Sequence, residues 1–219
     1  MSDEQALLRA VLETPFDDAP RLVYADWLDE HAQPERAAFI RLQCEHARLM
    51  KVHPRSSESL EWKAQCEAIL DGPSPASVPF RKLWADPIDP QWGDRYFFRR
   101  GFVSQVSVTA GRLVRLAGRL FAEHPITRVH LSDKRPNEAG GPGWAWCWGA
   151  AYLQNSPDVI PDPIWELLWR EFPPGFGVEY GSEEEALDAL SRAYVRYGRQ
   201  LAGLPIPTHW PTLLPRKCG

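Results

Sequence analysis

The sequence contains neither a long apolar run nor closely paired cysteines. No stretch approaches the roughly 18 apolar residues that a membrane-spanning helix needs, and the N-terminal MSDEQALLRA lacks the basic and apolar regions of a secretory signal. The four cysteines are scattered, without C-x-x-C spacing: Cys44, Cys66, Cys147 and Cys218. These absences predict a cytoplasmic protein with reduced thiols, and no membrane partner is expected.

Signatures of catalysis and metal binding are missing as well. The chain has no G-x-S-x-G, HExxH or EF-hand pattern, and its six histidines are dispersed. The glycine-rich residues 140–143 contain a proline and lack the following lysine and helix of a phosphate loop. Asp26 and Glu30 are four residues apart and share a helix face, but Asp29 and His31 do not have a spacing that converges on one point. This favours a solvated helix face, with Arg21 paired to one of the acids.

We therefore expect no catalytic residue, no metal ligand and no cofactor. The alternative is a small enzyme whose site is assembled from dispersed residues.

The net charge of −4 conceals three segments of alternating sign. Residues 1–50 carry five arginines against ten acidic residues, and residues 151–200 carry four against nine. Residues 95–135 carry nine basic residues against two acidic ones. Mutual neutralisation between the segments is the favoured interpretation, because phosphate binding usually needs a domain that is basic as a whole. Nucleic acid is thus not the expected partner, and an adaptor that binds it through 95–135 is the alternative.

The composition is that of a globular protein, with 44% apolar and 25% charged residues. Apolar spacing predicts four helices in a small N-terminal domain, at about 3–14, 18–31, 34–50 and 57–70. Ser2 and Gln5 form a capping box, and Asp18 is expected to cap the second helix. That helix is predicted to bury three apolar residues, with two aromatic ones at its margins: Leu22, Ala25 and Leu28, then Tyr24 and Trp27.

Beyond residue 94 the pattern changes to strand, helix and strand. A turn at Arg99–Gly101 lies between two strand-like runs, and a helix over about 111–124 leads to a strand at 126–131. This order predicts a right-handed parallel β-α-β crossover. A long amphipathic helix follows over about 182–202. The expected fold class is α+β, divided into a helical domain at 1–72, a proline-rich linker at 73–94, a β-α-β and C-terminal helical region at 95–203, and a proline-rich tail at 204–219.

The run DDAPRLVYADWLDE followed by RAAFIRLQCEHARL resembles the bacterial repeat-companion domain, over roughly residues 4–50. That domain is a short N-terminal module found ahead of leucine-rich and other repeats. Residues 92–131 look like the segment that leads into such repeats, which makes the β-α-β unit leucine-rich-repeat-like. No L-x-x-L-x-L-x-x-N repeat follows Leu131, so no solenoid is expected. The resemblance implies an architecture and no reaction.

Two groups of residues are candidates for binding a partner. Trp144, Trp146 and Trp148 alternate, so in a strand their rings point to one side, either into a core or toward a partner. Arg99 and Arg100 stand in the basic segment. The sequence therefore predicts a non-catalytic protein–protein interaction or adaptor module, with a protein as its partner.

Overall fold

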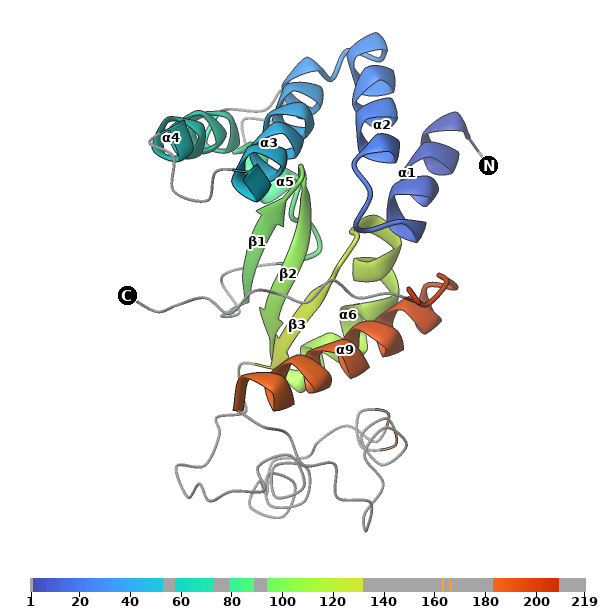
Figure 1. Cartoon of the computed structure of the whole chain (residues 1–219). Helices are drawn as coiled ribbons and strands as arrows, with labels where there is room; N and C mark the ends of the chain where they lie inside the picture. The colour runs from blue at the N-terminus through green and yellow to red at the C-terminus, as the bar shows by residue number, and fades with distance from the viewer. Residues whose placement is uncertain are drawn as a thin grey trace. The chain divides into compact units, whose positions relative to one another are not determined.

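The computed structural model describes residues 2–52, 58–72, 79–88, 94–131, 163, 166 and 183–208. They form helices and a three-stranded sheet, which confirms the predicted mixture of helix and sheet (Figure 1). The elements are α1 (Asp3–Glu13), α2 (Ala19–Glu30), α3 (Pro34–Val52), α4 (Glu58–Leu70), α5 (Phe80–Leu83), β1 (Arg95–Arg99), β2 (Phe102–Val108), α6 (Ala110–Glu123), β3 (Arg128–Leu131) and α9 (Glu183–Leu201).

The described residues fall into two compact units. The first consists of the residues up to Val106 together with Arg119–Thr127, and the second of Ser107–Gly118 and the residues from Arg128 onward. The predicted boundaries at 72 and 94 differ from this division. The difference arises because Phe102 of β2 belongs to the same core cluster as residues of α1, α2 and α3.

Helix α1 begins at the predicted capping box. Gln5 N–H donates to Ser2 Oγ at 3.3 Å, and Ser2 N–H donates to Gln5 Oε1 at 3.0 Å. These two bonds satisfy donors that the first turn of a helix leaves unpaired. The helix buries Val11 and Leu12 and ends at Glu13.

Helix α2 buries a different face from the predicted one. Leu22 is 40% exposed, whereas Tyr24 is buried and Arg21 is only 1% exposed. Together with Ala25 and Leu28, which the sequence does predict, the buried positions follow the i, i+3, i+4, i+7 spacing of one helix face. The prediction that Leu22 is buried is wrong, because a pattern counted on apolar residues alone cannot assign an arginine to the buried face.

The predicted N-cap position of α2 is confirmed, but the capping hydrogen bond expected there is absent. Asp18 stands at the N-cap position in a helical conformation, with φ −88° and ψ −25°, and its side chain makes no capping bond. Asp17 Oδ1 instead accepts a hydrogen bond from Ala19 N–H at 3.0 Å. The Asp18 carboxylate is therefore available for a contact outside the helix.

Part of the predicted linker contributes to the core. Phe80, Ala85 and Ile88 are buried. The Phe80 ring stacks on Trp84 with centroids 4.5 Å apart, and Trp84 stacks on Phe39 of α3 at 5.4 Å. Five prolines between 73 and 94 remove the periodicity that would reveal this packing in the sequence.

The strand order is β1-β2-β3. Thr127 N–H donates to Ser104 O at 2.8 Å, and Ser107 Oγ lies 3.1 Å from His130 Nδ1. Both pairs are separated by 23 residues. A constant offset means that β2 and β3 run parallel, as the α6 connection between them requires. Helix α6 thus connects two parallel strands, β2 and β3.

In the second unit, α9 packs on β3. Val129 N–H of β3 donates to Ser191 Oγ at 3.0 Å. The helix ends at Leu201, two residues before the predicted stop Gly203, which has a φ of 61°. Leu204, the first residue of the stretch predicted as a surface tail, is buried.

The β1–β2 hairpin closes through a two-residue turn. Arg100 and Gly101 have φ values of 52° and 82°. Positive φ at both central residues defines the type I′ turn, whose twist matches that of the strands it joins. This turn brings the Gly101 backbone against Ile40 of α3.

Gly101→Ala is expected to destabilise the first unit. An added Cβ would lie 2.4 Å from Ile40 Cγ1, and a φ of 82° disfavours any L side chain. We expect the free energy of unfolding in urea to fall by about 3 kcal/mol, from overpacking and strained backbone together. Gly203→Ala is the control, because its φ is also positive but nothing lies within 4 Å. It is expected to cost about 1 kcal/mol, and equal losses would contradict the close approach to Ile40.

Candidate functional site

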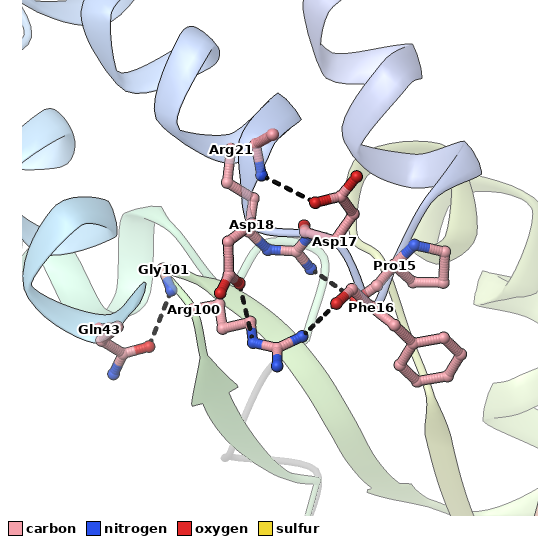
Figure 2. A network of polar contacts seen from close by, with 9 residues as sticks. Pro15, Phe16, Asp17, Asp18, Arg21, Gln43, Arg100 and Gly101 are labelled. Carbon is pink, nitrogen blue, oxygen red and sulfur yellow. Dashed lines mark hydrogen bonds and ion pairs between the residues drawn. The ribbon is translucent and has the colours of Figure 1, made fainter. Parts of the chain in front are cut away.

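Polar groups from three segments meet at the tip of the β1–β2 hairpin (Figure 2). Arg100 Nη1 donates to the Phe16 carbonyl at 2.8 Å, and its Nε lies 3.0 Å from Asp18 Oδ1. Gly101 N–H donates to Gln43 Oε1 at 2.8 Å. The hydrogen bonds span 84 and 58 residues of sequence, so they tie the turn to the loop before α2 and to α3. We call this group the hairpin-tip cluster.

Arg21 is a buried cation beside the cluster. Its Nη1 donates to the Asp17 carbonyl at 3.0 Å and its Nη2 to the Pro15 carbonyl at 3.1 Å. Its Cζ lies 5.6 Å from the centroid of the Phe102 ring. Burial lowers the pKa of Arg21 to about 10, so it is still charged at neutral pH. The two carbonyls and the ring compensate the loss of water around this charge.

Cys44 lies near the same charges and is a protonated thiol. Burial is the main cause that raises its pKa to about 11, and Asp18 adds to the rise. Arg21 and Arg100 act in the opposite direction without reversing it. Burial also raises the pKa of Cys66, and both thiols are free. Both thiols are buried and their pKa values are raised, whereas an activated nucleophilic cysteine is exposed and has a lowered pKa.

A second buried cation, Arg36, lies among aromatic rings. Its Cζ is 4.7 Å from the centroid of Trp84, 5.0 Å from Phe102 and 6.0 Å from Phe39. Burial lowers its pKa to about 10, and its Nη1 is buried without a hydrogen-bond partner. The rings supply the favourable contacts for this charge.

His124 is a buried neutral base in the same unit. Its Nε2 donates to the Asp86 carbonyl at 2.6 Å, which assigns the proton to Nε2. Nδ1 is buried without a partner. Burial, with a smaller contribution from the Arg36 charge, lowers the pKa of His124 to about 4. The side chain is therefore uncharged at neutral pH.

The acidic segment Asp26–His31 pairs differently from the prediction. Arg41, and not Arg21, bridges Asp26 at 2.7 Å and Asp29 at 2.5 Å. The His31 ring stacks on Trp27 with centroids 3.9 Å apart. In the parts of the chain that the structure describes, no three His, Cys, Asp or Glu side chains gather as a metal site would require.

The structure separates the two predicted partner-binding arginines. Arg99 is exposed at the end of β1, whereas Arg100 turns inward into the hairpin-tip cluster. Trp144, Trp146 and Trp148 lie outside the described residues. No protein-family model, curated protein or solved structure matches this chain. Among the described residues, no helix has the length and apolar character needed to cross a membrane.

The hairpin-tip cluster predicts energetic coupling between Asp18 and Arg100. Their side chains are 30% and 18% exposed, and Asp18 Oδ1 is otherwise buried without a hydrogen bond. A double-mutant cycle with Asp18→Asn and Arg100→Gln is expected to give a coupling of about 1 kcal/mol by urea denaturation. The exposed pair Arg48 and Glu45 is the control and is expected to couple by less than about 0.5 kcal/mol. Additive effects at Asp18 and Arg100 would rule out their ion pair as a stabilising contact.

His124 predicts a loss of stability in acid. Because its pKa is about 4 when folded and about 6.5 when unfolded, the unfolded chain takes up the proton first. Stability therefore falls as the pH drops from about 6.5 to 4, by about 3 kcal/mol from this group. His124→Gln is expected to flatten that part of a stability–pH curve, and the exposed His130→Gln to leave it unchanged. An unaltered slope in His124→Gln would contradict the buried neutral state.

Proposed function

We propose that this chain is a non-catalytic protein–protein interaction module whose N-terminal part is a repeat-companion domain. One observation carries the proposal. The polar groups that the family-like segment offers, at Asp18, Arg21 and Gln43, are engaged by the chain itself. They hold the hairpin against the helices and present no free nucleophile, base or ligand set. The segment therefore holds the hairpin and the helices together, and its exposed surface is the part that can bind a partner.

The charge distribution favours a protein partner over nucleic acid. Within the basic segment, Arg100 pairs with Asp18 of the acidic N-terminal segment. Arg128 lies 3.7 Å from Asp188 of the acidic C-terminal segment. Arg119 pairs with Asp86 and with Glu123. These pairs consume part of the positive charge that a phosphate backbone would need. The Arg100 and Arg128 pairs support mutual neutralisation between the segments.

The free thiols fit the proposed cytoplasmic setting. Cys44 and Cys66 are buried and unpaired. Reduced cysteines are typical of the bacterial cytoplasm, where disulfides are rare. We propose Trp144, Trp146 and Trp148 as partner-binding residues, because aromatic side chains are enriched at the centres of interfaces.

Capture of a partner tests this proposal. The purified full chain, carrying a photo-crosslinker, is incubated with nuclease-treated host lysate, and the products are identified by mass spectrometry. A defined protein is expected in near-stoichiometric yield. Triple Trp→Ala substitution at 144, 146 and 148 is expected to lower that yield at least tenfold, as hot-spot residues do. Arg48→Ala, at an exposed position on α3, is the control.

Two results would overturn the proposal. Capture from untreated lysate that is absent from nuclease-treated lysate would assign the surface to nucleic acid. Loss of the folded circular dichroism signal in the Trp variant would assign those rings to a core.

A further inference from the structure

We draw no further inference here: the strongest candidate, the exposed face of helix α2 with Leu22 and Val23, lies on a helix whose neighbouring carboxylates are already paired by Arg41, and nothing in the structure shows what covers it.

Discussion

The fold of the first unit depends on the close approach of the hairpin turn to helix α3. Gly101 lies so near Ile40 that a Cβ has no room, and both turn residues have positive φ. This approach fixes the position of β2 and places Phe102 in the core cluster with Tyr24 and Ile40. It also sets Arg100 within reach of Asp18. Gly101, which lies 58 residues after Gln43 of α3, thus fixes how β2 packs against the N-terminal helices.

Two buried arginines follow from the same geometry. Arg21 and Arg36 both lie over the Phe102 ring, at 5.6 and 5.0 Å from its centroid. Desolvation costs a guanidinium much of its hydration energy, and the ring recovers a part of it. Arg21 adds two backbone carbonyls, whereas Arg36 adds Trp84 and Phe39. Cation–aromatic contacts therefore stabilise part of the core, and they accommodate buried charges that aliphatic side chains would not.

This explains what the sequence predicts well and what it does not. The capping box at Ser2, the helices α1 to α3, the turn before Phe102 and the β-α-β order depend on neighbouring residues, so spacing alone predicts them. The inward position of Arg21 depends on a ring that lies far away in the chain. A local signal for this position exists, because Arg21 and Arg36 each have buried residues three and four positions further along the helix. Periodicity counted only on apolar residues misses that signal.

The same limit applies to the predicted site. Sequence reasoning treats Arg99 and Arg100 as one basic pair, because adjacent charges contribute equally to a charge count. The strand and its turn separate them: Arg99 ends an alternating strand with its side chain outward, and Arg100 enters a positive-φ turn and pairs with Asp18. Alternation then assigns to Arg99 different companions, Phe97 and Arg95, at two-residue spacing. A charge count therefore treats as equivalent two arginines that the strand period and the turn place in different surroundings, with the guanidinium of Arg100 paired to Asp18.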